Sequence, residues 1–255
     1  MCADILVLLT TYYYYEITIL LIFAICYIYF KEKLMFIICR VFFISLLLIT
    51  LSYAQGFYID KSGEQTFRFK DDMGRNQATF FSHAPFEDIT GLSNDVSGWV
   101  SFDIQDVKNT LLGEVIIKTA SIKTGIENRD EHLRTSEWLN AEVHPNITFV
   151  IKEVTTINSD ISNILRLTVL GDFTVRGVTR QVFSDVTMEY LEESELTKIR
   201  MPGDLLGVKA KFNITLSDYG VRHMLIGKRV SEEVEIKTNI IGTNASDVPK
   251  TNGFN

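Results

Sequence analysis

The stretch that decides the fold of this 255-residue chain covers residues 165–188 and reads LRLTVLGDFTVRGVTRQVFSDVTM. Apolar and polar residues alternate at both of its ends, and this period of two indicates a strand with one face in a core and one in water. The segment RGVTR between the two runs is typical of a tight turn, in which Gly177 adopts unusual backbone angles. Gly171 interrupts the first run, which predicts a bulge or bend. The stretch therefore predicts a bent strand, a turn and an antiparallel return.

The same alternation recurs along the rest of the chain. One helix is predicted over residues 129–140, with Asn128 as its cap and Asp130 and Glu131 in its first turn. Hairpin-like connections favour an antiparallel sheet, and unprotected edges favour its closure into a barrel of about eight strands, with a sandwich as the alternative. The further predicted strands cover residues 57–60, 65–70, 77–83, 86–92, 96–104, 113–122, 147–154, 208–216 and 234–240.

Composition divides the chain into an apolar region, residues 1–54, and a barrel domain, residues 55–242, followed by a polar tail over residues 243–255. The first 54 residues contain three basic and three acidic side chains, so the remainder carries 22 basic and 29 acidic residues. This net charge of −7 argues against nucleic acid as a partner. Cys2, Cys26 and Cys39 all lie in the apolar region, so the barrel domain has no thiol chemistry and no disulfide.

Residues 35–54 resemble a signal peptide. Arg40 precedes an apolar run of residues 41–51, and Ser52 and Ala54 are small residues suited to cleavage before Gln55. We therefore expect export, to the periplasm or the extracellular space. Residues 1–34 leave two alternatives, because translation starts either at Met35 or at Met1. In the second case the apolar residues 17–30, although short for a bilayer span, belong to a membrane hairpin that anchors the protein.

Four segments carry motifs of a known family: ASIKTGIENRDEHLR (120–134), WLNAEVHPNITF (138–149), GDFTVRGVTRQV (171–182) and FNITLSDYGV (212–221). Together they resemble the YceI-like family of exported, lipocalin-like barrels that bind polyisoprenoids. Arg176 stands where the family usually has histidine, and Trp138-Leu139 stands where it commonly has a pair of aromatic residues. The resemblance covers residues 57–241 and implies an all-β, eight-stranded antiparallel lipocalin-like barrel with one short helix and an isoprenoid chain in its bore.

The resemblance implies non-enzymatic binding and carriage or storage of a long apolar lipid, with transient membrane contact. At the mouth of the barrel we expect Arg129, His132, Trp138 and Arg176. Each residue also has a plainer interpretation, such as core packing for Trp138 or a solvated turn charge for Arg176. The inward-facing residues expected to contact the ligand are Phe102, Ile117, Phe149, Leu167, Val169, Phe173, Val175, Phe212 and Ile214.

The main alternative is an exported interaction or structural module with a packed core and no lipid, because alternation alone does not tell what an apolar face meets. No nucleophile–base set or phosphate-binding loop is present, so no catalytic residue is predicted. His132 stands near two acidic residues, but the other histidines are scattered, so neither a metal site nor a cofactor is predicted, apart from the lipid itself. A monomer and a homodimer both fit the sequence.

Overall fold

The computed structural model describes residues 21, 31 and 55–246. The predicted signal peptide and both alternatives for residues 1–34 fall outside the described residues, apart from two isolated positions. No helix in this described part is long and apolar enough to cross a membrane.

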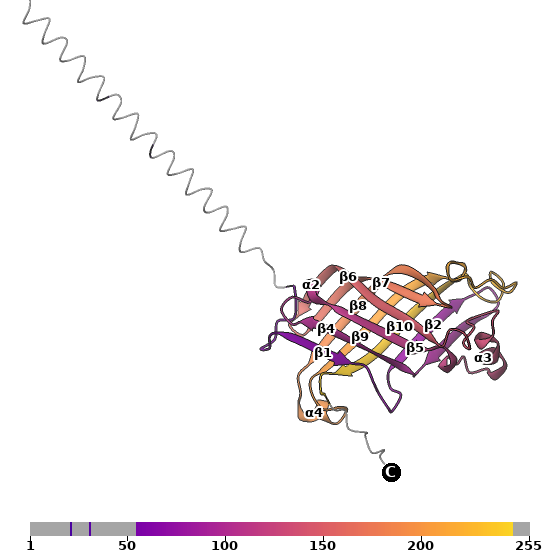
Figure 1. Cartoon of the computed structure of the whole chain (residues 1–255), viewed down its shortest axis with the longest axis horizontal. Coiled ribbons are helices and arrows are strands. Elements are labelled where there is room, and N and C mark those ends of the chain that lie inside the picture. The colour runs from indigo at the N-terminus through magenta and orange to yellow at the C-terminus, as the bar shows by residue number, and fades with distance from the viewer. Residues whose placement is uncertain (1–20, 22–30, 32–54, 247–255) are drawn as a thin grey trace, which may run out of the picture. The chain divides into compact units, whose positions relative to one another are not determined.

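Ten strands form one antiparallel sheet within residues 55–246 (Figure 1). Two one-turn helices, α2 (Val107–Thr110) and α4 (Glu195–Lys198), accompany α3 (Glu127–Arg134). The strands are β1 (Glu64–Arg68), β2 (Gln77–His83), β3 (Asp88–Ser93), β4 (Val96–Asp103), β5 (Leu112–Lys118), β6 (Asn146–Ile161), β7 (Ile164–Val175), β8 (Val178–Leu191), β9 (Leu205–Thr215) and β10 (Glu233–Thr243).

Eight of these strands close into a ring, in the order β1-β4-β5-β6-β7-β8-β9-β10 and back to β1 through the pair Arg68 and Thr243. The hairpin of β2 and β3 continues along the same edge of β10 beyond the end of β1. Leu92 of β3 exchanges both backbone hydrogen bonds with Lys123, at 2.8 and 2.9 Å, and so protects the outer edge of the hairpin. The predicted eight-stranded antiparallel barrel is confirmed.

The predicted hairpin of residues 165–188 is confirmed, as β7 and β8. Arg176 (φ 52°) and Gly177 (φ 73°) form the two-residue turn, and two positive φ angles match the right-handed twist of the flanking strands. The predicted bulge at Gly171 is wrong. Pairing of β7 with β8 runs unbroken through Gly171, and the irregularity lies across from it in β6, between Ile151 and Glu153.

Gly171 has a packing role instead of a bulge. A Cβ atom at this position would lie 2.3 Å from Cζ of Phe149, the residue of β6 whose ring covers the glycine. Such a distance is far inside van der Waals contact, so any larger residue would displace the ring. Glycine therefore makes room for an aromatic side chain in the bore.

The predicted helix is shifted and shortened to Glu127–Arg134, and the predicted cap is wrong. Asn128 lies within the helix, and Ile126 at the N-cap position makes no side-chain capping bond. The helix ends early because the hydroxyl of Thr135 donates to the carbonyl of His132 at 2.7 Å and Asn140, with φ 51°, reverses the chain. Trp138 accordingly lies in a turn.

The strand predicted over residues 57–60 is also wrong, since this segment runs across the end of the barrel nearest α2. The N–H of Phe57 donates to the carbonyl of Ile104 at 2.8 Å, and that of Tyr58 donates to Ser162 at 2.8 Å. Phe57 is buried beside Phe102 and Tyr190, with ring centroids 5.8 and 5.7 Å away, and Phe67 lies 5.8 Å from Phe102. These aromatic side chains fill the barrel at its α2 end.

Candidate functional site

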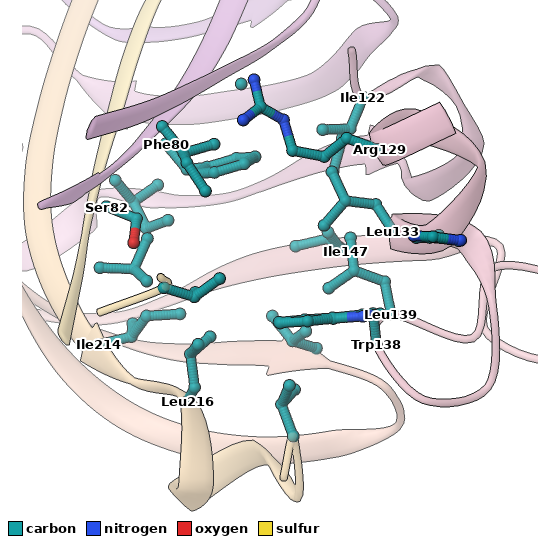
Figure 2. A pocket seen from close by; sticks show the side chains of 18 of the residues that line it. Phe80, Ser82, Ile122, Arg129, Leu133, Trp138, Leu139, Ile147, Ile214 and Leu216 are labelled. Carbon is teal, nitrogen blue, oxygen red and sulfur yellow. The ribbon is translucent and has the colours of Figure 1, made fainter. Parts of the chain in front are cut away.

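A cavity of about 500 Å³ opens at the α3 end of the barrel (Figure 2). Four connections meet at this end: the β2–β3 loop, the β5–β6 segment with α3 and the turns after it, the β7–β8 turn and the long β9–β10 segment. Antiparallel pairing places them together, because every second connection of a barrel lies on the same side. The cavity therefore lies beneath loops contributed by distant parts of the chain.

Apolar side chains make up most of the cavity wall, as Figure 2 shows. They come from the inward faces of β2, β3, β5, β6, β7, β9 and β10 and from the loops above them. An apolar wall with few polar groups is the ordinary character of a small-molecule site, and the volume falls within the usual range of roughly 300–1,000 Å³. The labelled members in Figure 2 are Phe80, Ile122, Leu133, Leu139, Ile147, Ile214 and Leu216.

Polar and charged side chains lie at the rim of the cavity. The indole of Trp138 stacks on the ring of His223, with centroids 4.8 Å apart and planes 30° from parallel. Nε2 of His223 lies 3.6 Å from Oε2 of Glu137. These three residues join the turns after α3 to the β9–β10 segment across the opening.

Arg129 points from α3 into the same opening and is held by its own contacts. Its Nε donates to the hydroxyl of Thr124 at 2.8 Å, and Nη1 lies 3.2 Å from Oε2 of Glu87 in the β2–β3 loop. Asp130, next to it, accepts the N–H and the hydroxyl of Thr124, both at 2.6 Å. Burial raises the pKa of the Asp130 carboxyl, but these hydrogen bonds outweigh burial and hold the pKa below its usual value.

Arg176 ties two loops of the mouth together. Its guanidinium donates to the carbonyl of Gly220 at 3.1 Å and to that of Ser136 at 3.0 Å. Arg176 is absent from the cavity wall, whereas Arg180, across the same turn, donates only to the neighbouring Thr179 carbonyl among the described residues. Arg176 therefore holds the turns after α3 and the β9–β10 segment together at the mouth.

The predicted contact residues separate into groups at different depths. Ile117, Phe173, Val175 and Ile214 line the cavity, as do Arg129, His132 and Trp138 of the predicted mouth. Phe149 and Phe212 pack directly below, with centroids 5.6 Å apart. Leu167, Val169 and Phe102 are buried in the core, outside the cavity wall, and Phe102 belongs to the aromatic cluster near α2. Contact of any of these residues with a ligand stays a prediction.

The sequence-based list omits the wall contributed by β2 and β3. Ala78, Phe80 and Ser82 alternate along β2 and line the cavity, so the period of two could have identified them. Gly91 of β3 faces Phe80 closely, since a Cβ there would lie 2.0 Å from the ring. Val221 and Leu225 of the β9–β10 segment carry no periodic signal, and only the folding of that segment over the opening brings them to the cavity.

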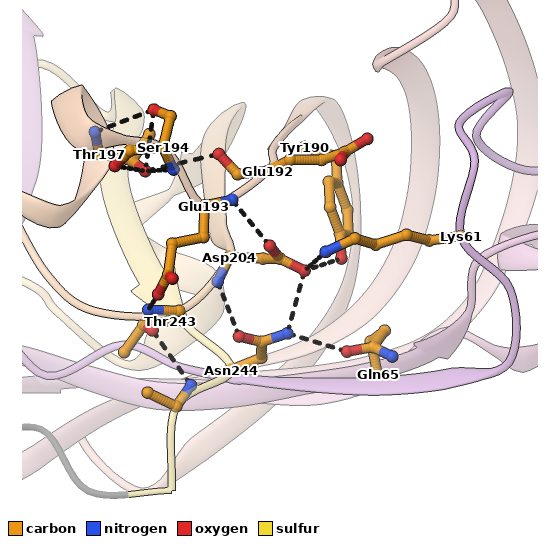
Figure 3. Close-up of polar contacts among 12 residues, drawn as sticks. Lys61, Gln65, Tyr190, Glu192, Glu193, Ser194, Thr197, Asp204, Thr243 and Asn244 are labelled. Carbon is orange, nitrogen blue, oxygen red and sulfur yellow. Dashed lines mark hydrogen bonds and ion pairs between the residues drawn. The ribbon is translucent and has the colours of Figure 1, made fainter.

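A polar network closes the opposite end of the barrel around Asp204 (Figure 3). The carboxylate accepts from Lys61 Nζ at 2.5 Å, from the Tyr190 hydroxyl at 2.6 Å and from the N–H of Glu193 at 2.8 Å. Asn244 accepts the Asp204 N–H at 2.9 Å. Burial raises the pKa of Asp204, but the hydrogen bonds from Lys61 and Tyr190 outweigh it, so that the pKa lies below its usual 3.8.

This network links the first residues of the barrel domain to its last strand. Its carboxylate is fully occupied by donors, so its role is to fix the α2 end of the barrel rather than to receive a ligand. Elsewhere in residues 55–246, His, Cys, Asp and Glu side chains form no group of three or more that could hold a metal ion.

Comparison with known proteins places this architecture in a family. A family model described as a YceI-like domain matches residues 69–241. A UPF0312 protein of Yersinia enterocolitica is 31% identical over 196 residues, which cover 75% of this chain and 88% of that protein. A UPF0312 protein of Pseudomonas fluorescens is 30% identical over 168 residues, covering 66% and 77%.

Among solved structures, BcnA of Burkholderia cenocepacia is similar with a TM-score of 0.52 and 19% identity, covering 68% of this chain and 100% of BcnA. At that identity the likeness is one of fold. The family model spans most of the barrel, from β2 into β10, and includes the β7–β8 turn and the mouth, so this chain belongs to the YceI-like family.

Proposed function

We propose that this protein binds an isoprenoid-type apolar lipid in the cavity at the α3 end and carries or stores it without chemical change. The single observation that supports the proposal most strongly is the cavity itself, which has an apolar wall and a volume of about 500 Å³. Family membership supports the same class of ligand, through the polyisoprenoid binding that the resemblance implies. No set of side chains in the described cavity wall combines a nucleophile with a positioned base, which supports binding without catalysis.

The energetics favour a carrier over an irreversible trap. Burial of each methylene-sized group contributes about 0.8 kcal/mol relative to water, but a bilayer already buries the same chain. Transfer from a bilayer to an apolar cavity is therefore close to neutral, and the ligand exchanges with membranes. Phe86, Ile126, Val143 and Met224 are exposed apolar residues in connections at the cavity end. We propose that these four apolar residues, here called the exposed mouth residues, touch the bilayer during exchange.

Export completes the proposal. The signal-like residues 35–54 support delivery to the periplasm or the extracellular space, where a lipid carrier can exchange its ligand with a membrane. Determination of the N-terminal residue of the protein isolated from its native cells tests this point. A start near Gln55 is expected, and a protein that retains residues 35–54 in the cytoplasm would contradict export.

The lipid itself is tested by mass spectrometry of organic extracts from natively purified protein. The wild type is expected to release an apolar lipid. Ile117→Trp places a large ring in the cavity and is expected to lose that lipid while the barrel remains folded. Ile116→Trp is the matched control, because Ile116 neighbours Ile117 on β5 but faces the other side of the sheet and is outside the cavity wall.

A wild-type protein that yields no lipid and takes up no added apolar probe would overturn the proposal and support the alternative of a module with a packed core. Equal lipid content in both variants would place the ligand outside this cavity. Circular dichroism of each variant confirms that the barrel is folded before the extracts are compared.

A further inference from the structure

The cavity ends inside the barrel instead of running along its whole bore. On β7, only Phe173 and Val175 reach it, although that strand extends from Ile164 to Val175. These two residues are two steps apart, so they cover roughly 7 Å of the strand. None of the described residues of β1, β4 and β8 lines the cavity. An apolar chain that enters at the mouth therefore meets a closed layer partway down.

Three phenylalanines form that layer. Phe149 of β6 is paired across the strands with Phe173 of β7. The Phe212 ring of β9 lies 4.9 Å from Phe173 with planes 75° apart, and 5.6 Å from Phe149. These geometries are those of favourable edge-to-face and tilted aromatic contacts. Phe173 and Phe212 are buried, and the half-buried Phe149 packs against the same core.

Gly171 of β7 makes room for one ring of this layer. The ring of Phe149 occupies the space above this glycine, where a Cβ would approach to 2.3 Å. Below the layer lie Val169, Leu167 and then the aromatic cluster of Phe57, Phe102 and Tyr190. The bore thus has an open upper part and a filled lower part.

We propose that Phe149, Phe173 and Phe212 act as a floor that limits the length of the bound chain, so that this protein selects short apolar chains over long polyisoprenoids. The inference rests on the proposed function and names the ligand class more narrowly. The cavity of about 500 Å³ occupies only the part of the bore above this floor, so the distance from the mouth to the floor sets the length of chain that can be bound.

The test measures dissociation constants for isoprenoid alcohols of ten, fifteen, twenty and forty carbon atoms, by displacement of a fluorescent apolar probe from the delipidated full-length protein. The wild type is expected to bind one of the shorter alcohols best and the forty-carbon alcohol at least tenfold more weakly. Phe212→Ala removes part of the floor and is expected to move the optimum to a longer chain. Phe212→Leu is a milder variant that serves the same purpose where the alanine variant fails to fold.

Phe102→Ala is the matched control, because it makes the same truncation in the cluster near α2, below the floor. Its length preference is expected to equal that of the wild type. Wild-type binding of the forty-carbon alcohol as tightly as the fifteen-carbon one would overturn the floor while leaving the proposed function standing. An unchanged optimum in folded Phe212 variants would do the same, whereas failure to bind any alcohol would overturn both proposals.

Discussion

Tyr190 and Tyr219 are both buried, yet their hydroxyls differ in hydrogen bonding. The Tyr190 hydroxyl donates to Asp204 at 2.6 Å, whereas that of Tyr219 has no partner among the described residues. Burial is the main cause that raises the pKa of each hydroxyl, and that of Tyr219 reaches about 12, so both remain protonated at neutral pH. A buried hydroxyl is stabilising only when it is paired.

Removal of these two hydroxyls is therefore expected to change the free energy of unfolding differently. Tyr190→Phe is expected to lower the free energy of unfolding by about 1.5–3 kcal/mol, because the lost bond had a charged acceptor. Tyr219→Phe, the matched control, is expected to leave stability within about 0.5 kcal/mol or to raise it. Urea unfolding at pH 7 measures both, and equal losses in the two variants would contradict the assignment.

The loss in Tyr190→Phe depends on pH with a definite sign. Because the pKa of Asp204 is lowered in the folded protein, its stabilisation is fully present above the ordinary value of 3.8 and is lost as pH falls through the lowered value. The difference between wild type and Tyr190→Phe is therefore expected to be largest near neutral pH and to shrink below about pH 4. If the difference in the free energy of unfolding instead grew as the pH fell, the ionised Asp204 carboxylate could not be the acceptor that stabilises the Tyr190 hydroxyl.

At the scale of elements, the β7–β8 turn holds the mouth in place through Arg176. Arg176→Ala removes the two hydrogen bonds to Ser136 and Gly220 and is expected to speed amide hydrogen exchange in residues 135–145 and 216–223 by roughly tenfold, which corresponds to about 1.4 kcal/mol of local opening. Arg180→Ala removes a charge beside the same turn but neither of these two hydrogen bonds, and is the control.

Exchange measured by mass spectrometry resolves the two mouth segments from the barrel strands. Faster exchange confined to the mouth in Arg176→Ala is the expected pattern. Equal exchange in both variants would show that the loops are held without the guanidinium, for example by the stack of Trp138 on His223.

At the scale of the whole molecule, the cavity and the exposed mouth residues lie at one end of the barrel, and the Asp204 network closes the other. The double variant Phe86→Ser, Met224→Ser is expected to slow transfer of a bound apolar probe to zwitterionic vesicles by roughly tenfold, because each side chain lost from the bilayer contact forfeits apolar burial. Its dissociation constant for the probe is expected to stay unchanged.

Phe183→Ser with Leu112→Ser is the matched control. Phe183 is exposed on β8 and Leu112 begins β5 at the end opposite the mouth, so both are apolar losses away from the cavity. Transfer rates that fall equally in the two double variants would show that general surface hydrophobicity, rather than contact through the mouth, governs the exchange.

Alternation and turn chemistry are properties of neighbouring residues, so they were enough to predict an antiparallel sheet and the β7–β8 hairpin with its turn at Gly177. The resemblance of four segments to the YceI-like family added the closed barrel. Alternation also identified inward faces, such as that of Phe149, Phe173 and Phe212. Only the tertiary structure decided how deep each inward residue lies, since depth depends on the register between strands far apart in the chain.

The same reason explains the individual errors. Gly171 carries the signature of a bulge, but the Phe149 ring that lies over it comes from another strand, β6, where Gly171 itself pairs with Ile151. Only the packing of the two strands shows that the glycine accommodates a ring. The early end of α3 depends on Thr135 and Asn140, whose local turn overrides helix propensity. The bore holds a cavity in its upper part and a packed core in its lower part. The three aromatic rings between the two parts come from β6, β7 and β9 and meet only when the barrel closes.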